Sequence, residues 1–263
     1  MVYHANQIHR QQEKALMEYN FYTSIAKYYD YIFPENQGQI NFIRNFISKH
    51  KKDINLLDIG CATGSTLLAL SKEIYSGVGI DLDEELIHIA REKCLKRCEH
   101  VFFKKMNMLN INETFFPSSF DLITCFGNTI PHLNNLDEIS LFLKHVHDLL
   151  KINGVFLCQL INFDRVLDMN ISNLSTIDND HIKFIRNYKS SVKSQSVEFN
   201  TTLIIKNENI TLKNSIPLYP IRQSELMMLM LGNGFSDISR FGNFKMNQFN
   251  QNSVSVILKA IKL

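Results

Sequence analysis

The stretch from Leu56 to Gly64, with the sequence LLDIGCATG, constrains the fold of this chain more than any other. Its apolar start predicts a buried strand, and Asp58 stands where this strand would end. Gly60 and Gly64 bracket a tight turn, in which the backbone must bend sharply and let a ligand approach closely. Helix-forming residues follow, so the segment predicts a strand, a glycine turn and a helix whose first N–H groups point back at the ligand.

The spacing of the glycines narrows the choice of ligand. A dinucleotide-binding turn has the pattern G-x-G-x-x-G, but Cys61, Ala62 and Thr63 follow Gly60 here. Instead an acid, Asp58, precedes the first glycine by two residues. This D-x-G-x-A-x-G arrangement resembles the first motif of class I S-adenosylmethionine (AdoMet) methyltransferases, with the acid near the ammonium group of the cofactor. The alternative is an ordinary strand, turn and helix with incidental glycines.

A second acid at a strand end supports a nucleoside ligand. Ser76 to Asp81 reads SGVGID, an apolar strand that ends in an acid. The acid follows the glycine turn by roughly twenty residues, where doubly wound folds bind the ribose hydroxyls. Asp81 could instead cap the next helix, which starts near Glu84, but Asp83 is the better cap. We therefore expect Asp81 to bind the ribose.

Strands and helices alternate between Asn55 and Leu160. We expect strands near Asn55–Ile59, Gly77–Asp81, Val101–Lys105, Phe120–Cys125 and Val155–Leu160, and helices near Ser65–Glu73, Glu84–Lys96 and Leu136–Leu150. This alternation predicts an α/β, Rossmann-like fold with helices on both faces of a parallel sheet and ligands at the carboxyl ends of its strands. Two final strands, near Ser236–Phe241 and Val254–Lys259, would complete a seven-stranded, mostly parallel sheet like that of methyltransferases.

The pattern changes between Arg165 and Ser215, where no convincing helical period occurs. Segments such as HIKFIRNYK, SVEFNTTLIIKN and ITLKNSIPLY alternate like antiparallel strands, with a hairpin turn at 207–209. We predict an N-terminal helical and aromatic segment over 1–50 and a cofactor-binding core over 51–164 and 216–263. A β-rich insertion over 165–215 would serve as a lid or a dimer contact.

Composition and charge limit the partners. The 263 residues include 28 basic and 26 acidic ones, and this net charge of +2 offers no electrostatic footprint for nucleic acid. The N-terminus lacks the apolar stretch of a secretory signal, and no run approaches the roughly 18 apolar residues of a membrane span. Cysteines and histidines are scattered without metal-ligand spacing. We predict a cytoplasmic protein without nucleic-acid, membrane or metal partners.

A narrower resemblance begins at residues 125–133, CFGNTIPHL, which are similar to the C-x-G-N-S-x-x-H-L stretch of glycine N-methyltransferase and related small-molecule methyltransferases. Four further pieces match that family in order and spacing. They are Met106-Asn107-Met108, Asn162-Phe163-Asp164, Leu218-Tyr219-Pro220 and Gly242-Asn243-Phe244-Lys245. The resemblance to class I methyltransferases thus extends over almost the whole chain.

The resemblance implies a role for each matching residue, with AdoMet as the methyl donor and S-adenosylhomocysteine as the product. The cofactor would contact Asp58, Gly60, Cys61, Ala62 and Gly64 at its methionine end, Asp81 at the ribose, and Leu82, Asn107, Met108 and Phe126 at the adenine. The substrate and the transferred methyl would lie near Asn128 and His132, and Tyr219 would reach into the acceptor pocket. Separately, a tyrosine of the aromatic N-terminal segment suits a sulfonium cation, with Tyr29 ahead of Tyr22.

One position departs from the family pattern. In glycine N-methyltransferase an arginine just before N-Y-D clamps the substrate carboxylate, whereas Ile161 stands at that position here. Isoleucine cannot make a two-pronged contact with a carboxylate. We therefore expect an acceptor that is less anionic than glycine, unless Arg165 or Arg186 supplies the contact from another position.

Two functions stay open. The first is a methyltransferase that moves the sulfonium methyl of AdoMet to N or O of a small-molecule acceptor by in-line displacement, with catalysis resting on proximity and alignment. An alcohol acceptor would need a base, for which His132 is the first candidate. The alternative is a catalytically silent AdoMet-binding or regulatory protein, and a nicotinamide-dependent dehydrogenase is a weaker third. A homodimer is possible.

Overall fold

The computed structural model describes residues 21–47, 53–95, 98–190 and 195–263. These residues form two compact units. The larger unit consists of Glu35–Asn170 and Ile221–Leu263, and the smaller unit combines the described residues up to Pro34 with Ile171–Pro220. Each unit has its own sheet and its own hydrophobic core.

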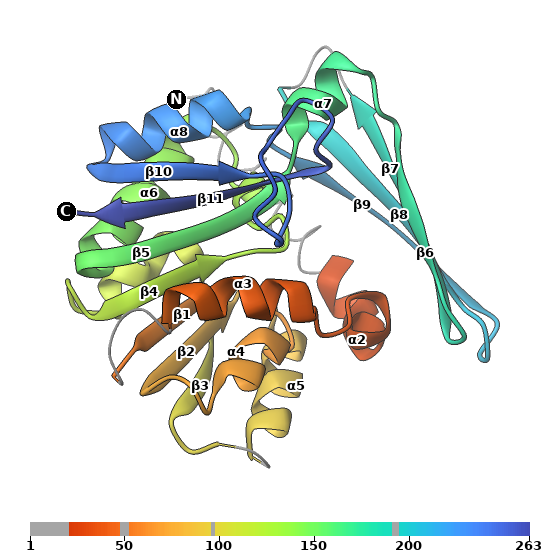
Figure 1. The fold of residues 1–263 in the computed structure, drawn as a ribbon. Helices are drawn as coiled ribbons and strands as arrows, with labels where there is room; N and C mark the ends of the chain where they lie inside the picture. The colour runs from red at the N-terminus through yellow and green to blue at the C-terminus, as the bar shows by residue number, and fades with distance from the viewer. Residues whose placement is uncertain (1–20, 48–52, 96–97, 191–194) are drawn as a thin grey trace, which may run out of the picture. The chain divides into compact units, whose positions relative to one another are not determined.

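The larger unit is built on a seven-stranded sheet (Figure 1). In sheet order its strands are β10 (Phe235–Phe241), β11 (Ser255–Lys262), β5 (Leu150–Ile161), β4 (Phe120–Cys125), β1 (Asn55–Ile59), β2 (Ser76–Asp81) and β3 (Val101–Lys105). Pairing is parallel from β5 to β3, and β11 runs antiparallel to both of its neighbours. This sheet confirms the predicted fold class.

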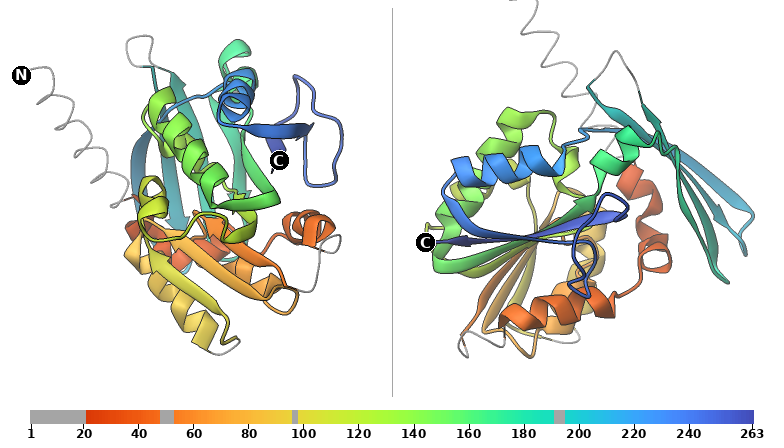
Figure 2. Two further views of the ribbon diagram at one scale, coloured as in Figure 1. Left: turned by 90° about the vertical axis from the view of Figure 1, so that its left-hand side faces the viewer. Right: turned by 45° about the horizontal axis from the view of Figure 1, so that its top comes forward.

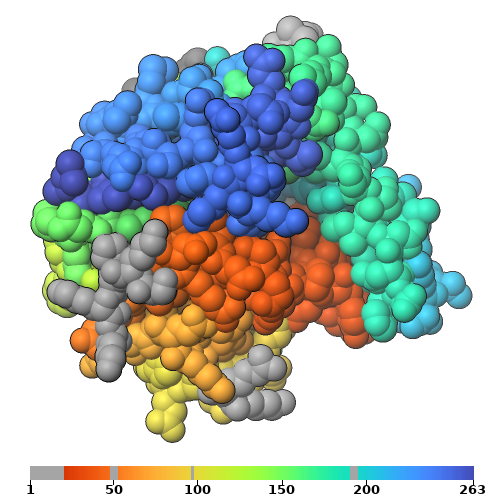
Figure 3. Space-filling view, viewed as in Figure 1, coloured from red at the N-terminus to blue at the C-terminus, as the bar shows by residue number. Residues whose placement is uncertain are grey.

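Helices cover both faces of this sheet (Figure 2). One face carries α3 (Gln37–Ile47), α4 (Ser65–Leu70) and α5 (Glu84–Leu95), and the other carries α6 (Leu136–Leu149) and α8 (Gln223–Gly232). The apolar side chains of α3, α4 and α5 form one buried cluster with the strands beneath them. The segment between β10 and β11 lies beside α3 on the surface (Figure 3), and the ring of Phe244 packs with its centroid 5.8 Å from that of Phe42.

The predicted bounds of β1, β3 and β4 agree with the structure, and other elements differ at their ends. α4 ends at Leu70 instead of Glu73, because the N–H groups of Ser71 and Glu73 bond to carbonyls three residues back, as in a tightened last turn. The last predicted residue of the next helix, Lys96, lies outside the described residues. Another helix, α7 (Phe163–Asp168), was not predicted, because six residues are too few to show a helical period.

The smaller unit contains an antiparallel sheet in the order β6 (Asn173–Asp178), β7 (Ile182–Ser190), β8 (Val197–Ile205) and β9 (Ile210–Leu218). The alternating segments correctly indicated β7, β8 and β9, and a turn over 206–209 joins the last two. β6 was missed because most of its side chains are exposed, so it lacks an apolar face. Apolar side chains of η1 (Ala26–Tyr28), α2 (Tyr29–Ile32) and residues 21–25 pack against this sheet.

The predicted domain limits differ from these units. The predicted N-terminal segment is divided, because its residues up to Pro34 group with the smaller unit whereas α3 groups with the larger one. Residues 1–20 and 48–50 of that segment lie outside the described part of the chain. The antiparallel sheet runs from Asn173 to Leu218, whereas the predicted insertion spans 165–215. Its role as a lid or a dimer contact stays a prediction.

Candidate functional site

The glycine turn after β1 has left-handed backbone at both of its predicted glycines. The φ angle is +71° at Gly60 and +75° at Gly64, a region that side chains disfavour. A Cβ at Gly60 would clash with Oγ1 of Thr129, and one at Gly64 would lie 2.5 Å from the ring of Phe103. The close approach expected from a ligand is therefore made by the protein's own side chains at both positions.

Asp81 joins this turn to the end of β2. Its Oδ2 accepts a hydrogen bond from the N–H of Ala62 at 2.9 Å, and its Oδ1 accepts one from the N–H of Asp83 at 3.1 Å. Asp83 in turn accepts from the N–H of Leu86, so it caps α5 as expected. Each carboxylate oxygen can accept more than one hydrogen bond, so Asp81 keeps capacity for ribose hydroxyls. Burial raises the pKa of Asp81, and the two backbone hydrogen bonds oppose that rise.

Apolar and polar residues predicted to contact the adenine lie beside this acid. Leu82 is 40% exposed although it directly follows Asp81. The N–H of Met106, just after β3, donates to the carbonyl of Asp81 at 2.8 Å, so the loops that follow β2 and β3 are joined. Asn107 accepts from the N–H of Leu109 and caps the 3-10 helix η2 (Met108–Glu113). An exposed leucine next to a carboxylate suits a nucleoside, which presents a flat apolar base and a polar sugar.

Asp58 lies within the buried end of β1. Its side chain is 5% exposed, and its Oδ1 accepts a hydrogen bond from the hydroxyl of Thr124 on β4 at 2.7 Å. Burial raises the pKa of Asp58 to about 7; the bond from Thr124 opposes this rise and the charge of Asp81 adds to it. A nearby cation would favour the ionised carboxylate, so Asp58 suits the ammonium role predicted for it.

Asn128 holds the loop after β4 against the end of β5. Its Oδ1 accepts from the N–H of Ile161 at 2.9 Å, and its own N–H donates to the carbonyl of Gln159 at 3.3 Å. The adjacent N–H of Gly127 donates to Oε1 of Gln159. The loop ends in a 3-10 helix, η3 (Ile130–His132). His132, the predicted base, is the last residue of this helix and is half-buried.

Phe126 lies in a different environment from the other predicted adenine contacts. It is buried, and its ring is 5.6 Å from that of Phe244 and 6.5 Å from that of Phe42, measured between centroids. This aromatic packing accounts for Phe126 without a ligand. Cys61 is likewise buried in the hydrophobic cluster under α4 and α5. Their contacts with the cofactor stay predictions.

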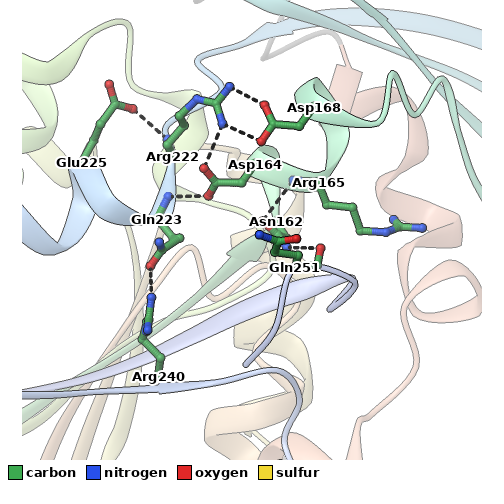
Figure 4. Close-up of polar contacts among 9 residues, drawn as sticks. All are labelled: Asn162, Asp164, Arg165, Asp168, Arg222, Gln223, Glu225, Arg240 and Gln251. Carbon is green, nitrogen blue, oxygen red and sulfur yellow. Dashed lines mark hydrogen bonds and ion pairs between the residues drawn. The ribbon is translucent and has the colours of Figure 1, made fainter. Parts of the chain in front are cut away.

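The N-F-D motif at 162–164 forms part of a polar network at the end of β5 (Figure 4). Nδ2 of Asn162 donates to the carbonyl of Ser253 at 2.9 Å, so the motif fastens the segment before β11. Asp164 accepts from Nη1 of Arg222 and from the N–H of Gln223, both at 3.0 Å. Because Gln223 is the first residue of α8, Asp164 binds α7 to the start of that helix.

No local sequence pattern indicates a role for Arg222, which lies 58 residues after Asp164. Its guanidinium also contacts Asp168 at 2.7 Å (Figure 4). α8 begins at Gln223, whose N–H group donates to Asp164. The side chain of Arg165, by contrast, extends away from this network.

The remaining predicted residues belong to the smaller unit. The ring of Tyr29 packs on that of Phe33 with a centroid distance of 5.1 Å, and Tyr219 follows β9. Their roles at the cofactor and in the acceptor pocket stay predictions. Across the described ranges, no three His, Cys, Asp or Glu side chains gather as metal ligands would. Among those same residues, no helix is long and apolar enough to cross a membrane.

Comparison with known proteins identifies the segment that carries these acids. Residues 57–156 match the family of methyltransferase domains. A putative methyltransferase of Geobacillus sp. (strain WCH70) is 26% identical over 194 residues, which cover 72% of this chain and 76% of that protein. A carboxy-S-adenosyl-L-methionine synthase of Helicobacter pylori (strain HPAG1) is 28% identical over 181 residues, 65% of this chain and 72% of that protein.

A solved structure shares the overall topology. The S-adenosylmethionine-dependent methyltransferase from Clostridium acetobutylicum ATCC 824 has a TM-score of 0.78 at 16% identity, with 92% of this chain and 99% of that chain covered. The family match spans both strand-end acids, Asp58 and Asp81. Residues 57–156 are therefore similar to methyltransferase domains, and the chain shares the fold of a solved S-adenosylmethionine-dependent methyltransferase.

Proposed function

We propose that this protein transfers the methyl group of AdoMet to N or O of a small-molecule acceptor. The observation that carries the proposal is the arrangement of Asp81, which accepts from the N–H of Ala62 in the glycine turn and from the N–H of Asp83, and is followed by the exposed Leu82. Asp81 would hold the ribose, Leu82 and Met108 the adenine, and Asp58 the ammonium group. AdoMet supplies a methyl already activated on a sulfonium.

The residues of this chain would orient the acceptor and exclude water. A lone pair of the acceptor N or O forms the new bond to carbon as the carbon–sulfur bond breaks, and the sulfur keeps its electron pair in S-adenosylhomocysteine. Alignment of this kind can supply about 7–11 kcal/mol of the barrier. For a hydroxyl acceptor the proton would pass to His132, which is half-buried near Asp81.

The test of cofactor binding is a calorimetric titration with S-adenosylhomocysteine. Asp81→Ala should weaken binding by about 1.5–3 kcal/mol, roughly 10- to 150-fold, because hydrogen bonds to a charged group are lost. Asp121→Ala is a matched control, because Asp121 also accepts from a backbone N–H, that of Asn55, but lies at the amino ends of β1 and β4. An affinity that is unchanged in Asp81→Ala would refute the ribose assignment.

Turnover is tested with AdoMet and a panel of small amines, alcohols and carboxylic acids, with products identified by mass. One relative is a carboxy-S-adenosyl-L-methionine synthase, so the mass of the transferred group is measured rather than assumed. The second candidate, a silent AdoMet-binding protein, is favoured by the engagement of the Asn128 side chain with Ile161. Tight cofactor binding without methyl transfer to any member of the panel would support that candidate.

A further inference from the structure

One row of polar side chains crosses an otherwise apolar face of the antiparallel sheet in the smaller unit. Directly opposite residues on neighbouring strands share a face of a sheet. Arg186 on β7 lies opposite Thr201 on β8, which lies opposite Asn214 on β9. We call these three residues the polar row. The rows on either side are Phe184, Leu203 and Leu212, and Tyr188, Phe199 and Ile216.

Two neighbouring members of the polar row have buried atoms without partners. Thr201 is 4% exposed, and within the described residues neither its Oγ1 nor the Nε of Arg186 has a hydrogen-bond partner. The third member, Asn214, donates to the hydroxyl of Ser24. Leaving a buried polar atom unpaired costs free energy. Two such atoms on facing residues indicate a place where a further group completes the hydrogen bonding.

Arg186 gives this place a positive charge. Nη2 of Arg186 donates to the carbonyl of Ser175, and no acid among the described residues forms an ion pair with this guanidinium. Acids elsewhere in the unit have other partners: Asp178 pairs with Lys206, and Glu208 pairs with Lys27. Burial lowers the pKa of Arg186, which the neighbouring Tyr188 opposes. A half-buried guanidinium with free N–H donors is suited to a carboxylate.

We propose that the polar row binds the carboxylate of a small molecule with an apolar body. One carboxylate oxygen accepts from Nε of Arg186 and the other from the hydroxyl of Thr201. The apolar body packs beside Tyr188 and Phe199, whose ring centroids are 5.4 Å apart and of which Phe199 also contacts Phe21. The site lies wholly within the smaller unit and does not depend on the cofactor residues.

This site bears on the expectation drawn from Ile161. Ile161 stands where glycine N-methyltransferase has the arginine that clamps the substrate carboxylate. The polar row contains a cation, Arg186, on a different element. Where the bound carboxylic acid is also the methyl acceptor, the inference rests on the proposed function. Where the acid is a separate ligand, it makes the same contacts with the polar row. Methylation of the bound acid distinguishes an acceptor from a separate ligand.

The test compares phenylacetate with phenylacetamide, its neutral analogue, by saturation-transfer NMR and calorimetry on the full chain. The wild type should bind the carboxylate at least about tenfold more tightly than the amide, because the ionised group makes the stronger hydrogen bonds. Arg186→Gln should abolish that preference, and Thr201→Val should reduce it. Lys213→Gln removes a charge from a neighbouring residue on the opposite face of the sheet and should leave the preference unchanged.

Stability measurements separate binding from a purely structural role. Thr201→Val removes an unpaired buried hydroxyl and should raise stability while it weakens carboxylate binding; a structural role would raise stability alone. Equal binding of acid and amide by the wild type, or an unchanged preference in both row variants, would overturn the site. If Arg186→Gln does not fold, the carboxylate preferences of the wild type and of Thr201→Val still test the site. A parallel titration with S-adenosylhomocysteine reports separately on the proposed function, and product masses show whether the bound acid is methylated.

Discussion

Gly64 and Gly127 have almost the same backbone conformation in very different surroundings. Their φ angles are +75° and +74°, but a Cβ at Gly64 would lie 2.5 Å from the ring of Phe103, whereas nothing lies within 4 Å of one at Gly127. Left-handed backbone costs a side chain roughly 1–2 kcal/mol, and overpacking adds about 1–3 kcal/mol. We expect Gly64→Ala to lower the free energy of unfolding by about 2–5 kcal/mol.

Gly127→Ala serves as the matched control for this substitution. It should lower the free energy of unfolding only by the cost of left-handed backbone, about 1–2 kcal/mol. Both variants are compared with the wild type by urea denaturation. Equal losses in the two variants would show that the ring of Phe103 moves away without cost, and that backbone conformation alone requires glycine at position 64.

The raised pKa of Asp58 predicts a pH-dependent cofactor affinity. Its folded-state pKa of about 7 exceeds the ordinary 3.8, so its contribution to stability is complete below about pH 4 and is lost as the pH rises through 7. An ammonium group next to Asp58 would favour the carboxylate and lower this pKa. We expect AdoMet affinity to increase between about pH 5.5 and 7.5, with release of protons on binding.

Calorimetry near neutral pH in two buffers of different ionisation enthalpy measures this proton release. Asp58→Asn should bind AdoMet more weakly and lose both the proton release and the pH dependence. A wild-type affinity that is constant over this pH range would place the ammonium group away from Asp58.

The strand-end acids were predictable because their positions depend on local order along the chain. A strand that ends in an acid and is followed by glycines can be recognised within ten residues, as at Asp58. The reason that Gly60 must be glycine could not be recognised, because Thr129 approaches it from a loop far along the chain. In the same way, nothing near Asn128 indicates that its side chain binds the N–H of Ile161.

At the scale of elements, α7 and α8 are held together by Arg222. Its guanidinium contacts Asp164 at 3.0 Å and Asp168 at 2.7 Å, and its side chain is 37% exposed. Solvent weakens such pairs, but two carboxylates share this guanidinium in a network. We expect Arg222→Met, which keeps an apolar stem, to lower the free energy of unfolding by about 1–2 kcal/mol.

Lys144→Met provides the comparison, because Lys144 forms an exposed ion pair with Asp148 one turn along α6. Its loss should cost about 0.3–0.5 kcal/mol. Both variants are measured by urea denaturation at low and high salt. Similar losses would mean that the Arg222 network contributes no more than an ordinary surface pair.

Elements with a clear apolar pattern were predictable, and short or polar elements were not. β1 and β4 are central strands that are almost fully buried, so the apolar residues that dominate them identify them. The short α7 and the exposed β6 are defined by partners elsewhere in the chain, such as Arg222 for α7 and β7 for β6. Periodicity over a few residues does not contain that information.

At the scale of the molecule, the core under α3, α4 and α5 and the core on the antiparallel sheet share no residues among those that the structure describes. The core under α3, α4 and α5 consists only of residues from the larger unit, and the core on the antiparallel sheet only of residues from the smaller one. The predicted cofactor acids, Asp58 and Asp81, and the residues that donate hydrogen bonds to them lie in the larger unit. The larger unit should therefore fold and bind cofactor by itself.

A shortened protein tests this independence. It begins at Glu35 and replaces Ile171–Pro220 with a short glycine–serine linker, which is feasible because the side chains of Asp168 and Arg222 are 2.7 Å apart. We expect cooperative unfolding and an S-adenosylhomocysteine affinity within about threefold of the full chain, a difference below 1 kcal/mol. Binding of phenylacetate should disappear, because the polar row is absent.

The same deletion carrying Asp81→Ala is the control, and it should lose cofactor binding as the full-length variant does. A shortened protein that does not fold would contradict the independence of the two cores. One that folds but binds the cofactor much more weakly would assign part of the cofactor contact to the smaller unit, where the predicted residue is Tyr29. The full chain carrying Tyr29→Ala then separates the tyrosine from the rest of the unit. Only a direct contact makes this single substitution weaken cofactor binding as much as the deletion does.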